Sequence, residues 1–567
     1  MIAEDVEVSQ TRTGSEILAD ALKNNGVDLI YHVPGESFIS VLDALKRHHG
    51  DIRQVSCRHE GGMAVMAEAY GKLSGRPGIA FVTRSPGATN AASGIHTAFQ
   101  DSSPMILFIG QVIRSQMERE AFQSYDFRQM FAPMAKWVAQ IDDAARIPEF
   151  VQRAFHMAMS PRPGPVVLVL PEDMLEDQAA VDDADPVRAV AGAAPSSESL
   201  EQLRGMLDRA DRPVMMVGGP GWSNQTRDQV QQFVDANDIP VVTTFRRRDI
   251  IDNRHRCYAG EIGIGANPKL LECIRNADLV IVLNDSLSEV NSIGEKYMLG
   301  FTLFGVPRPQ QKLVHIQGAI EELNRVYQAD LAILADVDRM AESLAAMEPV
   351  DAIRRRDWTE TLHQVNETDF TTSSCPGPLD LAAVFKGLRE RLPDDAILTN
   401  GVGAYAGWSQ RYFRHHALQT QLGPISGVMG YGVPAAISAK LLYPERIVVA
   451  VTGDGCFLMT AEELATAVKY KVGIVIVLIN NNMYGTIRIH QEKSYGGRVA
   501  GTDLTNPDFV AYAKAFGLHS ELVERTEEFA PAFERALGHG GPALIEMAID
   551  PDAIHTRYSL SSLQQRG

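Results

Sequence analysis

Short apolar runs separated by longer segments with helical spacing are the main pattern of this chain. In the first third these runs lie at 29–33, 78–82, 105–109 and 166–170. Runs of this length, bounded by turn residues, are typical of buried strands. Because the strands alternate with helical segments, the pattern predicts a parallel sheet flanked by helices.

The same rhythm returns twice. A second group of runs occupies 214–217, 240–242, 279–283 and 312–316, and a third segment contains 447–451 and 475–479. Two polar stretches with few large apolar residues, 172–197 and the region around 371–376, separate the groups and are interpreted as linkers. We therefore predict an α/β protein of three domains, each with a central parallel sheet, over 11–175, 198–346 and 378–551. The first and third domains have similar length and strand rhythm, which suggests two related sheets.

Composition narrows the range of partners. The chain has 567 residues, 45% of them hydrophobic and 22% charged, with a formal net charge of −18. Such acidity opposes binding to nucleic acid, which requires basic surface. No apolar segment approaches the roughly 20 residues that span a bilayer, and the acidic first residues lack the order of a secretory signal. Five cysteines without metal-ligand spacing are typical of reduced thiols. We expect a cytoplasmic protein without nucleic-acid or membrane partners.

The strongest chemical signal lies at the ends of two runs in the third segment. Run 447–451 leads into Gly453, Asp454 and Gly455, and run 475–479 leads into Asn480 and Asn481. Since parallel strands place ligands at their carboxyl ends, Asp454 and Asn481 can converge on one Mg²⁺. Mg²⁺ takes about six oxygen ligands and usually shares a phosphate group. A diphosphate ligand is implied.

A GDG followed about 27 residues later by NN resembles the signature of thiamine diphosphate enzymes. By this resemblance Asp454, Asn481 and the backbone carbonyl of Met483 bind the metal. Further residues that the resemblance places around the coenzyme are Val402, Gly403, Gly427, Gly453, Gly455, Cys456, Tyr484 and Gly485. Cys456 has no evident partner histidine and is interpreted as a small packing residue rather than a nucleophile.

The other end of thiamine diphosphate, its aminopyrimidine, requires a carboxylic acid beside a helix. Glu60 is our candidate, because the small residues that follow it let a helix approach a flat ring closely. Without its sequence context, Glu60 would be interpreted as an exposed acid at the start of a helix, where the helix dipole favours a negative charge. Its context resembles the pyrimidine-binding domain of the acetolactate synthase branch of the family. That resemblance assigns Glu60 as the activating acid. It also assigns Pro34, Thr83 and Asn90 to the coenzyme, Gln111 to catalysis, and Phe122 and Gln123 to the substrate pocket.

Met429 lies about 25 residues before Asp454, where the family has a large apolar residue that props the coenzyme in its bent form. A lone methionine is otherwise core filler. In this family the acid and the metal site come from different subunits. The resemblance therefore implies a homodimer or homotetramer with active sites at the subunit interface.

This sequence departs from the synthase pattern at positions that decide the acceptor. Ser286 stands where the synthases have an arginine for the acceptor carboxylate, and a bidentate clamp needs that donor. His490 stands where they have a tryptophan, and Ala404 and Tyr405 replace a Gln-His pair. The segment 217–221 resembles part of an FAD cradle but 245–249 does not, so the sequence leaves bound FAD open.

The resemblance implies decarboxylation of a 2-keto acid followed by carboligation, with thiamine diphosphate and Mg²⁺ as cofactors. The alternative within the class is a 2-keto acid decarboxylase, or a lyase for 2-hydroxyacyl or diketone substrates, with a neutral acceptor pocket. A homologue that binds the coenzyme without turnover is disfavoured, because Glu60, Asp454 and Asn481 are all present. A Mg-nucleotide enzyme would need a phosphate-binding loop of the GxxxxGK[ST] type, and none is evident.

Overall fold

Three six-stranded sheets dominate the computed structural model, which describes residues 10–47, 52–188, 190–294, 300–373 and 375–565. The chain forms two compact units. The first contains the first sheet together with Ile437–Leu442 and Thr460–Tyr470, and the second contains the second and third sheets. Within the described residues, no helix combines the length and the apolar character needed to cross a membrane.

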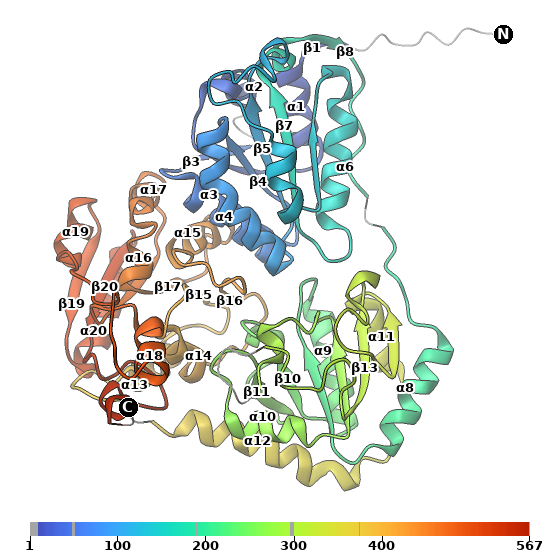
Figure 1. The fold of residues 1–567 in the computed structure, drawn as a ribbon, viewed down its shortest axis with the longest axis vertical. Coiled ribbons are helices and arrows are strands. Elements are labelled where there is room, and N and C mark those ends of the chain that lie inside the picture. The colour runs from blue at the N-terminus through green and yellow to red at the C-terminus, as the bar shows by residue number, and fades with distance from the viewer. Residues whose placement is uncertain (1–9, 48–51, 189, 295–299, 374, 566–567) are drawn as a thin grey trace. The chain divides into compact units, whose positions relative to one another are not determined.

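The first sheet is parallel throughout and has the order β3-β2-β4-β5-β7-β6. Its strands are β2 (Leu29–His32), β3 (Arg53–Ser56), β4 (Gly78–Val82), β5 (Met105–Gln111), β6 (Trp137–Gln140) and β7 (Pro165–Pro171). A common core joins one face of the sheet to α1 (Gly14–Asn24), α2 (Ile39–Arg47) and α6 (Ile147–Met159). The other face is covered by α3 (Glu60–Ser74) and α4 (Ser85–Asp101), as Figure 1 shows. These two helices pack closely, because a Cβ on Gly94 would lie 2.4 Å from the Cβ of Ala64.

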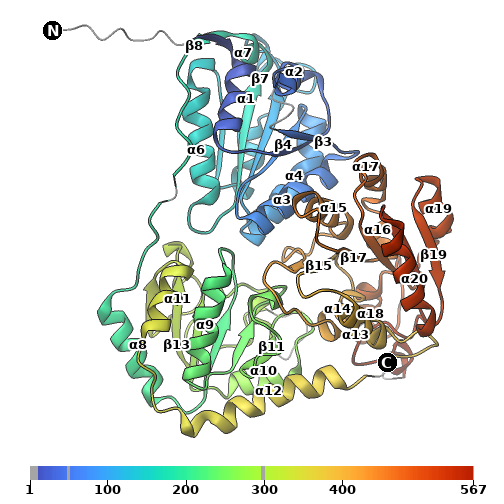
Figure 2. The ribbon, with the colours of Figure 1, turned by 180° about the vertical axis from the view of Figure 1, so that it is seen from behind.

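The second sheet is also parallel, with the order β11-β10-β9-β12-β13-β14. Its strands are β9 (Pro213–Val217), β10 (Val241–Thr243), β11 (Tyr258–Glu261), β12 (Leu279–Leu283), β13 (Lys312–Gln317) and β14 (Leu331–Leu334). One face packs on α8 (Ser197–Arg209), α9 (Asn224–Ala236) and α11 (Val337–Ala346), and the other on α10 (Pro268–Arg275) and α12 (Arg356–Thr371), which Figure 2 shows from behind. The strand order reverses between β9 and β12, which is where such sheets open a ligand crevice.

The third sheet has the order β16-β15-β17-β18-β20-β19 and is parallel. Its strands are β15 (Ile397–Asn400), β16 (Gln421–Leu422), β17 (Val448–Gly453), β18 (Val475–Asn480), β19 (His519–Val523) and β20 (Ala543–Ala548). The helices along this part of the chain are α13 (Leu381–Arg391), α14 (Ala406–Tyr412), α15 (Gly432–Leu442), α16 (Asp454–Phe457), α17 (Leu464–Lys469), α18 (Gly485–Ser494), α19 (Phe509–Ala515), α20 (Thr526–His539) and α21 (Leu560–Gln564). Of these, α17 and the last six residues of α15 belong to the first unit. Numbered within each sheet, the first and third sheets share one order, 2-1-3-4-6-5. This agrees with the prediction of two related sheets.

Every apolar run predicted as a strand forms one, and the α/β fold with parallel sheets is confirmed. The linker prediction is wrong for its first residues. Glu172–Glu176 form α7, and Gln178–Ala180 form β8, which pairs antiparallel with β1 (Thr11–Thr13). Arg12 reinforces this pairing by donating to the carbonyl of Val181 at 2.8 Å. An edge strand of three small or polar residues has no apolar pattern to reveal it.

Candidate active site

The two strands that carry the metal motif end side by side. β17 and β18 pair in parallel, with Gly453 opposite Ile479. Asp454 then begins α16 and is only 3% exposed. Its Oδ1 accepts the backbone N–H of Gly455 at 2.9 Å, which fixes the direction of the carboxylate.

Oxygen atoms from both strand ends converge on one amide group. Asn506 Nδ2 lies 2.9 Å from Asp454 Oδ2, 3.0 Å from Asn480 Oδ1 and 3.1 Å from Asn482 Oδ1. The Oδ1 of Asn506 is buried without a hydrogen-bond partner among the described residues. These side chains therefore form an oxygen-rich cluster beside the glycine turn. Sequence reasoning missed Asn506, because it comes from a loop about 50 residues after Asp454 and no spacing rule links the two.

The electrostatics of this cluster suit a cation. Burial raises the pKa of Asp454 above its ordinary value, although hydrogen bonds from Gly455, Asn506 and the backbone of Asn482 and Met483 oppose the shift. A buried carboxylate is stabilised in its charged form by a nearby cation. Among the described residues, no three His, Cys, Asp or Glu side chains gather as a metal site. A metal here would therefore be bound by one carboxylate, by neutral oxygen atoms of the protein and by oxygen atoms of a bound diphosphate. This donor set fits Mg²⁺.

The other predicted metal ligands follow β18 directly. Asn481 is half-buried, and its Nδ2 lies 3.7 Å from the place that a Cβ on Gly485 would take. Met483 is 9% exposed and forms an isolated antiparallel bridge with Asp503. Both residues therefore belong to the turn whose backbone contacts Asp454.

Tyr405 fills a space that three glycines leave open. A Cβ on Gly401 would lie 2.5 Å from the Tyr405 hydroxyl, and Cβ atoms on Gly403 and Gly453 would lie 2.6 and 2.5 Å from its ring. The hydroxyl is buried without a hydrogen-bond partner in the described part of the chain, and burial raises the pKa of Tyr405 well above its ordinary value. Cys456 lies beside it, 2% exposed, and its Sγ accepts the Gly430 N–H at 3.1 Å. Cys456 is thus enclosed by the fold beside Tyr405.

The remaining candidates of the third sheet lie in the loops that follow or precede its elements, except His490, which lies in α18. Val402 follows β15, whereas Gly427 and the half-buried Met429 precede α15. Tyr484 packs against Gly455, since a Cβ there would lie 2.5 Å from the Tyr484 ring. His490 lies in α18, and burial lowers its pKa below the ordinary value.

Glu60 lies at the carboxyl end of the first sheet, as the first residue of α3. It is 9% exposed, and its Oε2 accepts the amide of Asn90 at 2.9 Å. Its Oε1 lies 3.4 Å from the place that a Cβ on Gly87 would take. The structure thus brings together Glu60 and Asn90, which are 30 residues apart.

Other predicted residues of this unit lie at ends of neighbouring strands. Thr83 follows β4, and its Oγ1 is 3.1 Å from the hydroxyl of Ser37. Pro34 follows β2 and is exposed. Arg84, the residue after Thr83, pairs with Glu172 at 2.6 Å.

Gln111 and the predicted substrate-pocket residues, Phe122 and Gln123, differ in their burial and in their hydrogen bonds. Gln111 ends β5 and is 4% exposed, with its Nε2 donating to the carbonyl of Tyr125 at 2.9 Å. The carbonyl of Gln123 accepts the Ser85 N–H at 3.2 Å, which ties this loop to the start of α4. Phe122 is 76% exposed. An aromatic side chain this exposed is available to a ligand or to another protein surface.

The crevice of the second sheet is filled by the chain itself. Asn284 Nδ2 donates to the carbonyls of Gly218 and Pro220, at 3.2 and 2.6 Å. A Cβ on Gly218 would lie 2.6 Å from Asp285 Oδ2, so this carboxylate sits against the glycine turn. Asp285 is buried, and burial raises its pKa. Ser286 follows in the same loop and is half-buried.

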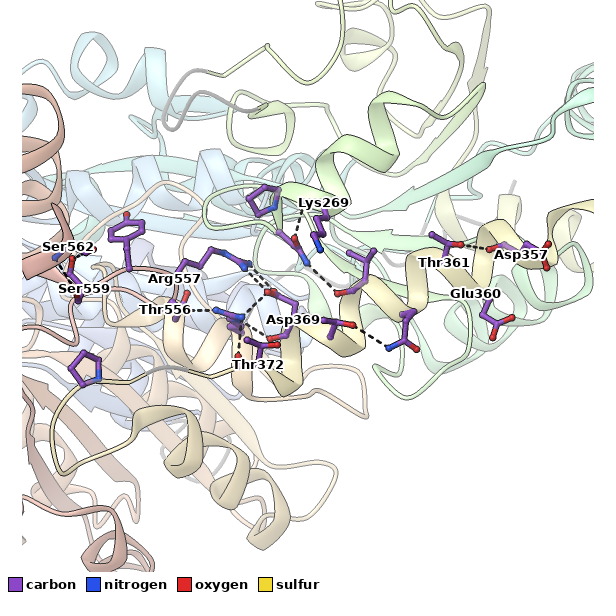
Figure 3. A pocket seen from close by; sticks show the side chains of 18 residues that line it. Lys269, Asp357, Glu360, Thr361, Asp369, Thr372, Thr556, Arg557, Ser559 and Ser562 are labelled. Atoms are coloured by element: carbon purple, nitrogen blue, oxygen red, sulfur yellow. Dashed lines mark hydrogen bonds and ion pairs between the residues drawn. The ribbon is translucent and has the colours of Figure 1, made fainter. Parts of the chain in front are cut away.

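A pocket of about 1140 Å³ in the second unit contains none of the predicted site residues. Figure 3 shows Asp369 at its centre, between Arg557 and other lining residues. Asp369 accepts from Arg557 at 2.6 and 2.9 Å and pairs with Arg411 at 3.0 Å. Two arginines share this one carboxylate, so the three side chains together carry a net charge of +1.

Comparison with known proteins gives matches in all three regions. The N-terminal TPP binding domain of the thiamine pyrophosphate enzymes matches residues 12–130, the central domain matches 200–344 and the C-terminal TPP binding domain matches 401–547. The acetolactate synthase of Mycobacterium bovis is 30% identical, over 96% of this chain and 89% of its own length. The acetolactate synthase isozyme 2 large subunit of Escherichia coli K12 is 28% identical, over 95% of each chain. The acetolactate synthase of Bacillus subtilis is 29% identical, over 95% of this chain and 93% of its own length.

Proposed function

We propose, since this chain belongs to the thiamine pyrophosphate enzyme family, that it decarboxylates a 2-keto acid and joins the remaining fragment to a second carbonyl compound, with Mg²⁺ as the metal. It is a thiamine pyrophosphate-dependent enzyme of the class that makes and breaks carbon–carbon bonds. The convergence of Asp454, Asn480 and Asn482 on Asn506 carries the proposal, because it creates an oxygen-rich site at the end of two parallel strands.

The side chains present fit the coenzyme and metal. Asp454, Asn481 and the Met483 carbonyl would hold Mg²⁺, and the glycine turn beside Asp454 lets a diphosphate approach the backbone. The unpartnered oxygen of Asn506 and the unpartnered hydroxyl of Tyr405 are buried polar atoms that such a ligand would satisfy. Bound thiamine diphosphate supplies an electron sink for the carbanion left by loss of CO₂.

Glu60 is proposed to hold and release the proton that activates the coenzyme. Asn90 occupies Oε2 with an N–H donor, so Oε1 is the carboxylate atom that remains for proton transfer. The amide of Asn90 also fixes the orientation of the carboxylate. A general acid held in this way loses little entropy when it acts.

The residues of the second sheet do not fit FAD. An FAD diphosphate needs free backbone N–H groups and space at the glycine turn. Here Asn284 and Asp285 fill that space, because Asn284 donates to the carbonyls of the turn and the Asp285 side chain packs against Gly218. We propose that the enzyme works without a flavin.

A second candidate function is a decarboxylase, or a lyase for 2-hydroxyacyl or diketone substrates. Ser286, which stands in the loop after β12, favours it, because a serine cannot clamp an acceptor carboxylate as a bidentate arginine does. An acceptor without a carboxylate would suit this loop.

Incubation with pyruvate, thiamine diphosphate and Mg²⁺ tests the proposal through product analysis. Acetolactate supports carboligation, whereas acetaldehyde supports the decarboxylase. Mass spectrometry of small molecules released from the purified protein identifies any bound coenzyme. Failure to take up thiamine diphosphate with Mg²⁺ present would contradict both candidates.

A further inference from the structure

Arg246 has a backbone conformation that an arginine rarely adopts. It follows β10 with φ +61°, in the left-handed region that favours glycine. This conformation costs free energy and persists only where surrounding contacts impose it. The contacts of Arg246, which include a hydrogen bond from its backbone N–H to the Glu261 carboxylate as well as the bonds of its side chain, hold this conformation.

Those contacts reach the third sheet. Arg246 is 5% exposed, and its Nη1 donates to the carbonyl of Pro424 at 2.8 Å while Nη2 donates to the carbonyl of Gly401 at 3.1 Å. A Cβ on Gly423 would lie 2.9 Å from Arg246 Cδ, so that position must stay small. The guanidinium also lies 5.0 Å from the Phe245 ring.

The two carbonyls belong to the two loops that carry predicted coenzyme residues. Gly401 immediately precedes Val402 and Gly403. Pro424 begins the segment that leads to Gly427 and Met429, and its carbonyl also accepts the Gly427 N–H at 3.4 Å. One guanidinium thus links both loops.

We propose that Arg246 is a positioning residue for the coenzyme, which holds the Gly401–Gly403 and Pro424–Met429 loops in their binding arrangement from the central domain. The inference rests on the proposed function. It assigns a role in the coenzyme site to a segment, 245–249, that does not resemble the corresponding loop of the synthases.

Arg248 provides a matched control from the same segment. It is also 5% exposed, and its side chain donates to the carbonyl of Gln410 and, at 3.5 Å, to the Tyr258 hydroxyl. Both arginines therefore join the second and third sheets. Only Arg246 contacts the coenzyme loops directly.

The test compares Arg246→Met, Arg246→Gly and Arg248→Met by calorimetric titration with thiamine diphosphate and Mg²⁺, and by Tm without coenzyme. Arg246→Gly removes the side chain but relieves the backbone, so it keeps the test valid if the methionine variant folds poorly. We expect both Arg246 variants to raise the Kd about tenfold or more, since hydrogen bonds from a charged donor are lost. Arg248→Met should lower Tm but change the Kd less than about threefold.

Two results would overturn the inference while leaving the proposed function intact. One is wild-type affinity in both Arg246 variants, and the other is an equal loss of affinity in Arg248→Met, which would indicate general loosening. If the unaltered protein itself binds no thiamine diphosphate, the proposed function fails and the role of Arg246 fails with it.

Discussion

Each of the two key carboxylates is held by the neutral amide of an asparagine. Asn90 donates to Glu60 and Asn506 donates to Asp454, both at 2.9 Å. An amide orients a carboxylate without cancelling its charge, whereas an arginine or a lysine would cancel it. Neither hydrogen bond pairs the carboxylate with a positive charge, which suits a proton-transfer group in one case and a metal ligand in the other.

Replacing Glu60 by Gln should lower turnover about 10²–10⁴-fold, because the amide cannot hold and release the proton. Binding of thiamine diphosphate should change little, since glutamine retains the shape of the side chain. Steady-state kinetics and calorimetric titration measure the two effects, with the exposed Glu176→Gln as control. A loss of less than tenfold would remove Glu60 from its assigned role.

Replacing Asp285 by Asn tests whether a buried charge at the crevice of the second sheet destabilises the fold. The folded-state pKa of Asp285 is raised by burial, so the protonated form stabilises the fold at acid pH and this stability is lost as pH rises through the folded pKa. Relative to the unaltered protein, the variant should become progressively more stable as pH rises above about 4, the ordinary pKa of an aspartate. Thermal unfolding at a series of pH values measures the difference in stability between the two proteins. A difference in Tm that does not change with pH would contradict the assignment.

At the scale of elements, every strand predicted from the sequence is an interior strand and none of the edge strands was predicted, but the interior strands β15 and β20 of the third sheet were missed as well. The apolar runs that became β4, β5, β12 and β18 are buried along their whole length. Edge strands such as β14 alternate buried and exposed residues over four positions, too few for a reliable period.

The residues of the site also divide into those that a local motif marks and those that only long-range contacts bring together. Glu60, Asp454 and Asn481 were predictable, because they follow motif-bearing segments at strand ends. Asn506 and Arg246 were not predicted as site residues, because their positions depend on loops that only the folded chain brings together. No local pattern encodes such contacts.

Two glycine-to-alanine substitutions in helices should have opposite effects on stability, because only one of the two glycines lies where α3 packs closely on α4. Gly94→Ala should destabilise the fold by about 1–3 kcal/mol, because its Cβ would lie 2.4 Å from the Cβ of Ala64 and force the helices apart. Gly205→Ala in α8 should stabilise by up to about 1 kcal/mol, since its Cβ would have 3.6 Å to the nearest atom, Arg209 Nη1, and alanine favours helices. Denaturant unfolding checks both. Equal effects would refute the packing argument.

At the scale of the whole molecule, the two halves of the proposed site belong to separate compact units of the chain. We propose that Glu60 of one copy completes the site of a second copy in a homodimer or homotetramer. Glu60→Gln and Asp454→Ala variants, each inactive alone, should then regain activity when they are unfolded and refolded together. In a mixed dimer one site would contain neither substitution. No recovery in confirmed mixed dimers would show that each chain builds its own site.

The strand order shared by the first and third sheets lets their residues be compared position by position. In each sheet the third strand along the chain, β4 or β17, is followed at once by a residue assigned to the coenzyme: Thr83 in one and Asp454 in the other. The same framework thus carries a hydroxyl at one corner and a carboxylate at the equivalent corner. In our proposal one sheet serves an organic ring and the other a metal, so the asymmetry of the catalyst depends on the residues and loops at the strand ends and not on the framework.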